Sequence, residues 1–366
     1  MSLLANLIPF LLPLLTLVST TEAQTTLQWP VEEAEVLFVG DAMQHGPQIN
    51  AARRAGGTYD YSECFAAIKP YIESADYAVV NFEATLGGSP YSGYPQFSAP
   101  EQYATALTDA GFDFFLLANN HILDRRDKGL HRTITTLDSM RIPHAGIYHD
   151  KAQRDTVVPA IVDVKGMKMA ILNYTYGTNG ISVQGPAVVD YIKRDKIAAD
   201  IKAARDAGAD LIAACMHWGV EYQLSPNREQ TDLANYLVDQ GVDLVIGSHP
   251  HVVQPMEMRT RADGSKALVV YSLGNFISNQ NDTNSRGGAM TRVKLRRNPA
   301  GKAEVVDANY ALVFVDKANG KHNYRLLPAE TADNPTARTF YNKATQIFKS
   351  NKGVEPDSLF LKAISL

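Results

Sequence analysis

Five short apolar runs recur along the chain and predict the strands of a buried sheet. They are EVLFVG (35–40), YAVVNF (77–82), FFLLAN (114–119), LIAACM (211–216) and LVIG (244–247). Their nearly continuous apolar character, without polar alternation, is typical of strands that are covered on both faces. We therefore expect a sheet that lies between other layers of the protein.

Amphipathic stretches of helical character separate most of these runs. The clearest are SAPEQYATALTDAG (98–111), KRDKIAADIKAARDAG (193–208) and SPNREQTDLANYLVDQG (225–241), each of which ends at a glycine suited to a helix C-terminus. The alternation of strands and helices predicts an α/β protein with parallel strand pairs.

The chain changes character after about residue 265, where strand-like segments predominate. KALVVYSLGNF (266–276), MTRVKLRR (290–297) and EVVDANYALVFVD (304–316) are expected to contribute a second sheet packed on the first. Residues 157–174 predict an earlier hairpin that turns at Lys165 and Gly166, and residues 334–351 predict a closing helix. Because no linker rich in Pro, Gly or Ser divides residues 24–366, we expect them to form one domain.

The N-terminus predicts a signal peptide over residues 1–23. The segment from Leu3 to Val18 is apolar, and small residues precede a cleavage site after Ala23. The first positively charged side chain is Arg53, so an uncleaved anchor is the alternative. Either interpretation implies an exported protein that is periplasmic, extracellular or membrane-associated.

The composition of the chain limits the kinds of partner that it can bind. The chain has 366 residues, of which 45% are hydrophobic, and a net charge of −4. Mixed charge without a basic stripe indicates that nucleic acid is not a partner. The two cysteines, Cys64 and Cys215, could form a disulfide after export, but their apolar surroundings favour two free, buried thiols.

Potential metal ligands follow all five apolar runs. In chain order they are Asp41, Glu83, Asn120 with its neighbour His121, His217, and the pair His249 and His251. Each residue alone has an ordinary explanation, such as a turn, a helix cap or a surface histidine. Because ligands of open α/β sheets bind beyond the carboxyl ends of the strands, we expect these side chains to converge on one site.

The chemistry of this set predicts a metal centre. Imidazole nitrogens and carboxylate or amide oxygens, without thiolates, suit Zn, Mn or Fe and differ from a structural zinc site built on cysteines. Pro250 favours extended backbone at His249, and in an extended segment His249 and His251 would point the same way.

The motifs GDAM, NFEATL, LANNHILD, HWGVEY, GSHPHVVQ and YSLGNF resemble those of the CapA family of poly-gamma-glutamate capsule biosynthesis proteins. The resemblance runs from about Glu35 to Gly288. That family is similar in fold to the calcineurin-like metallophosphoesterases, so the resemblance implies a four-layer α/β/β/α sandwich with its metal site at the strand ends.

The resemblance also implies roles for single residues. One metal would be bound by Asp41, Glu83 and His251. A second would be bound by Glu83, Asn120, His217 and His249. His121 would face the substrate as the catalytic residue rather than bind metal.

One position departs from the phosphoesterase pattern. Many of those enzymes carry a histidine two residues after the first aspartate, where this chain has Met43, and His45 lies two residues too far along. A thioether is a poor ligand for a hard divalent ion. We therefore expect one firmly held metal ion and a second that binds weakly.

Further residues near these motifs are candidates for substrate binding. They are Trp218, Glu221, Tyr222, Asn275 and Arg286. Arg286 has two possible roles. It either binds a phosphate or carboxylate through two hydrogen bonds, or it is a solvated loop residue. Asp124 either orients His121 or starts the next helix.

Two classes of function are compatible with these residues. The first is a metal-dependent hydrolase of phosphate esters, or of another ester or amide bond, that acts through a metal-activated water. The second is a weakly catalytic or non-catalytic factor that assembles, exports or tethers extracellular poly-gamma-glutamate. Either one implies an envelope polymer or a phosphate ester as partner, together with a membrane-bound synthase complex.

Overall fold

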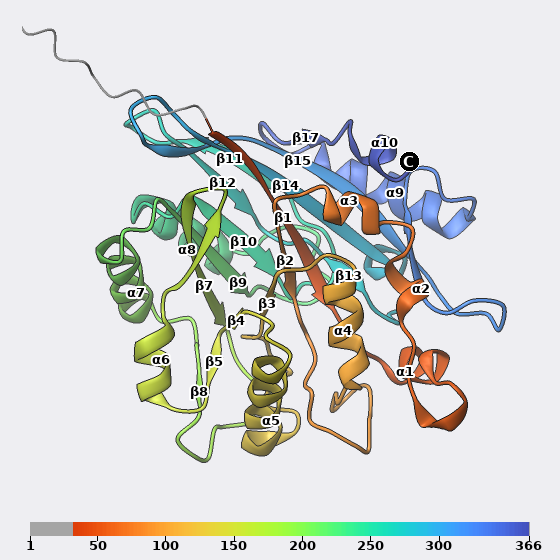
Figure 1. Ribbon diagram of the computed structural model, residues 1–366. Helices are drawn as coiled ribbons and strands as arrows, with labels where there is room; N and C mark the ends of the chain where they lie inside the picture. The colour runs from red at the N-terminus through yellow and green to blue at the C-terminus, as the bar shows by residue number, and fades with distance from the viewer. Residues whose placement is uncertain (1–31, 366) are drawn as a thin grey trace, which may run out of the picture.

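The computed structural model describes residues 32–365, so the predicted signal peptide and its cleavage site lie outside the described residues. Two β-sheets lie face to face, and helices cover the outer face of each (Figure 1). This arrangement confirms the four-layer α/β/β/α sandwich.

The first sheet has nine strands and is built around β1. Its order is β16-β15-β14-β1-β2-β3-β4, with β13 beside β1 and β17 beside β15. The strands are β1 (Glu32–Ala42), β2 (Tyr77–Asn81), β3 (Phe114–Leu116), β4 (His144–Ala145), β13 (Asn275–Ile277), β14 (Gly287–Arg297), β15 (Ala303–Asp316), β16 (Arg325–Pro328) and β17 (Glu355–Pro356). β1 to β4 are parallel, whereas β14, β15 and β16 continue the sheet in antiparallel pairs.

The second sheet has six strands in the order β11-β12-β10-β9-β7-β6. They are β6 (Ala160–Val164), β7 (Met167–Thr175), β9 (Leu211–His217), β10 (Leu244–Ser248), β11 (Met256–Thr260) and β12 (Lys266–Val270), and a separate short pair joins β5 (Ile147–Tyr148) to β8 (Val188–Val189). The hairpin of β6 and β7 turns at Lys165 and Gly166, whose φ angles are 48° and 79°. That turn is confirmed.

The prediction that the C-terminal β-rich part contributes a second sheet is wrong for most of its strands. β12 joins the second sheet, but β14 and β15 extend the first one. The reason lies in β1, which has apolar side chains on both faces and pairs with β14 along most of its length. Val36 and Phe38 of β1 then pack with Val293 of β14 in the layer between the sheets.

The helices cover the sheets through apolar stripes at helical spacing. On the first sheet lie α1 (Gly46–Ala52), α2 (Ser62–Phe65), α3 (Lys69–Glu73), α4 (Glu101–Asp109) and α5 (Arg126–Ser139). On the second sheet lie α7 (Arg194–Asp206) and α8 (Arg228–Asp239), with α6 (Lys151–Val157) beside β5. Leu130, Ile134 and Leu137 of α5 show the spacing. The three predicted internal helices are confirmed as α4, α7 and α8.

The closing helix is confirmed as α9 (Pro335–Phe348), which is followed by the short α10 (Phe360–Ala363). Phe340 and Phe348 of α9 pack against the layer between the sheets.

Cys64 and Cys215 are free and buried, as predicted. Among residues 32–365, no helix combines the length and apolar character needed to cross a membrane.

Candidate metal centre

The strand ends of both sheets meet at one end of the molecule. In the first sheet, Asp41 lies beside Asn81 and Asn275, and in the second sheet His217 lies beside Thr175 and Ser248. The amide of Asn81 bridges the sheets, since its Nδ2 lies 2.8 Å from Asp41 Oδ1 and 3.4 Å from His217 Nδ1. The expected convergence of the strand ends is confirmed.

This convergence depends on a close approach of two backbones. A Cβ atom on Gly40 would lie 1.9 Å from the carbonyl oxygen of Gly274. That carbonyl accepts a hydrogen bond of 3.0 Å from the backbone N–H of Asp41. Glycine at position 40 therefore lets β13 dock beside the end of β1, where Asp41 projects into the site.

Glu83 lies at the centre of the cluster. Its Oε1 is 3.8 Å from Nε2 of both His217 and His251, and 4.0 Å from Nε2 of His121. Both carboxylate oxygens are buried and have no hydrogen-bond partner. Burial, followed by the charges of Asp41 and Glu221, raises the pKa of Glu83 well above its usual range.

Asp41 and Asn275 fix the orientation of His251. His251 Nδ1 lies 2.9 Å from Asp41 Oδ2 and 3.1 Å from Asn275 Oδ1. With Nδ1 directed at these two oxygens, Nε2 is the nitrogen turned toward Glu83. A partner on one ring nitrogen that sets the direction of the other is the usual arrangement around metal-binding histidines.

The histidines of the second sheet are held in the neutral form by burial. Burial and the nearby histidines lower the pKa of His217 well below its usual value, and the same causes lower the pKa of His249 to about 3. His217 Nε2 lies 2.8 Å from Asn120 Oδ1, whereas His249 Nδ1 is buried without a partner. Neutral imidazoles keep the lone pair that a metal ion requires.

The predicted extended geometry around Pro250 is wrong. His249 and His251 have φ angles of 98° and 59°, in the left-handed region that costs a residue with a side chain about 1–3 kcal/mol. The backbone bends because its own groups are tied down: the N–H of His249 contacts Asp41 Oδ1 at 3.3 Å, and Pro250 O accepts from Tyr222 N at 2.8 Å. The two rings still come together, with centroids 5.9 Å apart.

Asp124 orients His121, which is one of the two roles predicted for it. His121 Nδ1 lies 2.8 Å from Asp124 Oδ2, and the backbone N–H of His121 donates to Asn119 Oδ1 at 3.0 Å. Asp124 also accepts a 2.7 Å bond from the backbone of Phe97, whose ring packs edge-on against His121. The imidazole is therefore held by Asp124 at Nδ1 and by the ring of Phe97, while Asn119 holds the backbone of His121.

The donor set fits a divalent cation. Two groups of three have ligand atoms within 4.8 Å of one another: Glu83 with His249 and His251, and Asp41 with Glu83 and His217. Glu83 belongs to both groups, as its expected bridging role requires, although the partners are divided differently from the implied assignment. A buried carboxylate without a donor is expensive in a metal-free protein, and a cation removes that penalty.

Met43 and His45 lie near the cluster in other roles. Met43 is buried, and its carbonyl accepts a 3.0 Å bond from Gln48. His45 contacts Gln48 and the backbone N–H of Asn279 through Nδ1, and burial lowers its pKa to about 4.

Three of the predicted substrate residues have structural partners. Trp218 is buried with α8, and its N–H donates to Tyr271 O at 2.9 Å. Asn275 lies behind His251. Arg286 donates to Val315 O from Nε at 3.3 Å and from Nη2 at 2.9 Å, so this edge of its guanidinium group already has a partner. Glu221 and Tyr222 are exposed, and Tyr222 lies beside His251.

Sequence reasoning missed three polar neighbours of the site: Asn81, Tyr176 and Asn179. Asn179 Oδ1 accepts from Asn120 Nδ2 at 3.2 Å, and the ring of Tyr176 lies 4.5 Å from that of His249. Tyr176 and Asn179 follow β7, which the sequence pattern predicted only as half of a hairpin. Since β7 runs parallel to β9, its end belongs to the same edge, and the rule that found His217 would have found Tyr176.

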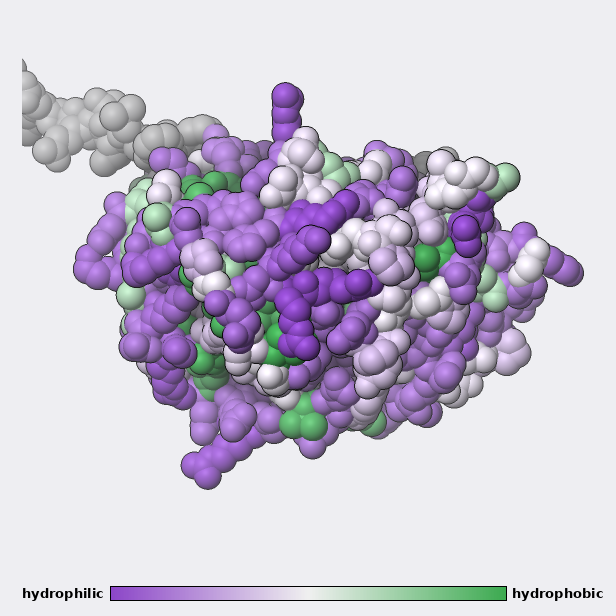
Figure 2. Space-filling view, turned by 90° about the horizontal axis from the view of Figure 1, so that it is seen from below, coloured by the Kyte–Doolittle hydropathy of each residue, from purple (hydrophilic) through white to green (hydrophobic). Residues whose placement is uncertain are grey.

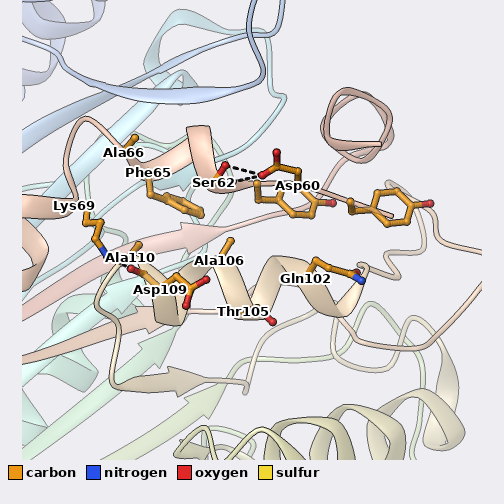
Figure 3. Close-up of a pocket in the computed structure, with 12 residues that line it drawn as sticks. Asp60, Ser62, Phe65, Ala66, Lys69, Gln102, Thr105, Ala106, Asp109 and Ala110 are labelled. Carbon is orange, nitrogen blue, oxygen red and sulfur yellow. Dashed lines mark hydrogen bonds between the residues drawn. The ribbon is translucent and has the colours of Figure 1, made fainter. Parts of the chain in front are cut away.

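A separate groove of about 420 Å³ lies between α2 and α4. Figure 3 shows Phe65 and Ala106 facing each other across it, with Gln102 and Asp109 at its margin. It shares no lining residue with the cluster around Glu83, so it is a distinct feature of the helical layer.

The comparisons with known proteins show the family to which the chain belongs. The family model of the bacterial capsule synthesis protein PGA_cap matches residues 35–280, and the chain belongs to this family. It is 29% identical to the capsule biosynthesis protein CapA of Bacillus anthracis over 289 residues, which are 76% of this chain and 68% of that protein. It is 25% identical to the PGA biosynthesis protein CapA of Bacillus subtilis over 277 residues, 73% and 69% of the two chains.

Solved structures show a more distant likeness. The calcineurin-like phosphoesterase YfkN from Bacillus subtilis is 14% identical, with a TM-score of 0.46 over 92% of this chain and 100% of that one. The NAD nucleotidase of Haemophilus influenzae is 16% identical, with a TM-score of 0.47 over 92% and 66%.

Proposed function

We propose that this protein is a metal-dependent hydrolase of phosphate esters that acts in the synthesis of poly-gamma-glutamate capsule or a related envelope polymer. The observation that carries the proposal is the state of Glu83, whose two buried oxygens lack any donor while three imidazoles surround them. Such a carboxylate is explained by a cation that binds it together with the neighbouring nitrogens.

The residues that would hold one or two divalent ions are Asp41, Glu83, Asn120, His217, His249 and His251. Zn, Mn or Fe, when bound there, would supply Lewis-acid chemistry that lowers the pKa of a water molecule and polarises a phosphoryl oxygen. Asn81 keeps Asp41 in place through its 2.8 Å hydrogen bond, and Asn275 does the same for His251.

His121 is the proposed catalytic residue. When Nδ1–H donates a hydrogen bond to Asp124 Oδ2, Nε2 is the nitrogen that faces Glu83. In its protonated form the ring can deliver the Nε2 proton to the leaving oxygen of the ester. Phe97 covers the edge of the ring and limits the approach of water.

The cellular setting is part of the proposal. The relatives from Bacillus are named for capsule and PGA biosynthesis, and we extend that setting to this chain, with an envelope polymer as partner beside a membrane-bound synthase complex. We propose export on the basis of the apolar N-terminal segment, and we expect the mature protein to begin at about Gln24. N-terminal sequencing of exported protein tests this, and an intact Met1 would replace the signal peptide with an anchor.

The test of activity compares two substrates on protein purified without a chelating tag. Bis(4-nitrophenyl) phosphate and poly-gamma-glutamate are incubated with metal-loaded wild-type protein and with Glu83→Gln. We expect wild-type protein to hydrolyse the phosphodiester and the variant to lose both bound metal and turnover. Metal-loaded protein that retains the polymer and cleaves neither compound would favour the alternative of an assembly or tethering factor.

A further inference from the structure

Exposed apolar side chains gather on the loops around the candidate metal centre. Of the eight exposed large hydrophobic residues in the described part of the chain, five lie on the loops that follow β2, β7 and β9: Tyr94, Tyr176, Val220, Tyr222 and Leu224. The end of β9 carries His217, and Glu83 follows β2 by two residues. Single exposed apolar side chains are ordinary on a protein surface, but the concentration of five of the eight at one edge points to a ligand-binding surface there.

Each of the three tyrosines reaches one of the site histidines through ring contacts. The centroid of Tyr176 is 4.5 Å from that of His249, and that of Tyr222 is 6.1 Å from that of His251. Tyr94 lies 6.5 Å from Phe97, which lies 4.6 Å from His121. The three rings nevertheless remain 74%, 48% and 52% exposed for Tyr94, Tyr176 and Tyr222, respectively.

The surroundings of these rings are polar. The face at the strand ends is mostly hydrophilic, with small and separate hydrophobic spots (Figure 2). Gln280 Nε2 donates to the hydroxyl of Tyr222 at 3.3 Å, and Glu221 places an exposed carboxylate on the same loop. A lipid surface would require a continuous apolar patch. Separate aromatic faces beside hydrogen-bonding groups suit a ring that offers one face for stacking and carries hydroxyl or amino donors at its edge.

We propose that Tyr94, Tyr176 and Tyr222 form an aromatic rim that stacks on a ring-shaped group of the substrate, a sugar or a nucleobase, next to the phosphate ester. Tyr176 is the member nearest the reacting group because it touches the ring of His249. Glu221 accepts hydrogen bonds from the ring donors and repels a second anionic group. This inference rests on the proposed function and specifies the substrate class of the same site.

The experiment uses three phosphate monoesters with metal-loaded full-length protein: glycerol 3-phosphate without a ring, glucose 1-phosphate with a sugar, and adenosine 5′-monophosphate with a base. KM and kcat are measured for wild type, Tyr176→Ala, Tyr176→Phe and Tyr222→Ala. The control is Leu359→Ala, an exposed apolar residue on the segment before α10. Calorimetric binding of the same compounds provides a readout that does not require turnover.

We expect wild-type protein to prefer at least one ring-bearing ester. In Tyr176→Ala, kcat/KM for that ester falls about tenfold more than for glycerol 3-phosphate, chiefly through KM, while Tyr176→Phe keeps the preference. A higher kcat/KM for glucose 1-phosphate would identify a sugar as the stacked group, and a higher kcat/KM for adenosine 5′-monophosphate would identify a base. Turnover without a ring preference, or an equal loss on all three esters, overturns the rim but leaves the proposed hydrolase intact. Ring-dependent binding of the esters without turnover would support the aromatic rim and overturn the proposed hydrolase.

Discussion

The side chains of His121 and Asp124 are joined by a 2.8 Å contact between Nδ1 and Oδ2, while the other ring nitrogen of His121 lies 4.0 Å from Glu83. One face of the imidazole therefore serves to position the ring, and the other faces the candidate site. This division predicts separable effects of substitutions at the two residues.

His121→Asn should keep the fold and the metal content but lower turnover by about 10² to 10⁴, because a general acid is lost. The loss should be larger for an ester with a poor leaving group than for an activated aryl ester, which departs without protonation. Steady-state rates on one substrate of each type measure the difference.

Asp124→Asn serves as the matched variant for a positioning role. It should lower turnover less than His121→Asn and change the pH profile of kcat, since the amide can donate to Nδ1 where the carboxylate accepts. An equal loss of His121→Asn on both leaving groups would argue against a general acid. Loss of metal from that variant would make His121 a ligand.

His249→Ala should remove most of the bound metal. The Nδ1 atom of His249 is buried without a partner, and its ring lies beside those of His217 and His251. Elemental analysis of protein purified without a chelating tag, before and after reconstitution with Zn and Mn, measures the effect. His322→Ala is the control, because His322 pairs with Asp316 outside the cluster. Wild-type protein that stays metal-free after reconstitution would refute the metal centre.

Glu83→Gln should stabilise the metal-free protein, and the gain should grow with pH. The pKa of Glu83 is raised in the folded state, so folding retains a proton that the unfolded chain releases above its ordinary pKa of about 4.5. The contribution of Glu83 to stability is therefore complete at low pH and is lost as pH rises toward the folded-state pKa.

Thermal melts of both proteins in a chelator measure this difference between pH 4 and pH 8. The two melting temperatures should be close at pH 4, and the variant should melt higher at pH 8. Addition of Zn or Mn should raise only the wild-type melting temperature at pH 8. A difference between the proteins that does not vary with pH would mean that Glu83 ionises normally.

Arg154→Ala should destabilise the protein by about 3–5 kcal/mol, because it leaves the buried carboxylate of Asp200 without its counter-ion, whereas Asp190 keeps its ion pair with Lys196. Arg154 of α6 pairs with Asp190 at 2.6 Å and with Asp200, whose carboxylate also accepts from Tyr174 at 2.7 Å. Urea denaturation measures the loss. Lys151→Ala on the same helix removes an exposed ion pair and should change stability by less than about 1 kcal/mol. Equal stability of the two variants would show that this buried network is neutral.

The sequence by itself determined the layers and most of the site. Runs such as EVLFVG and LIAACM are short and apolar throughout, which is typical of strands that are buried on both faces. The residues after these strands followed from the same rule, since parallel strands end at one edge. This is why Asp41, Glu83 and His217 could be identified from the order of residues alone.

Tertiary structure decided which strands became neighbours and how the histidine pair is oriented. Periodicity shows that β14 is a strand but does not show that its partner is β1, because pairing depends on side chains far apart in the chain. Pro250 favoured an extended segment, yet long-range contacts of the backbone with Asp41 and Tyr222 outweighed that local preference and placed His249 and His251 in left-handed conformations. Tyr94, Tyr176 and Tyr222 became one rim for the same reason, since only the packing of two sheets brings their three loops to a common edge.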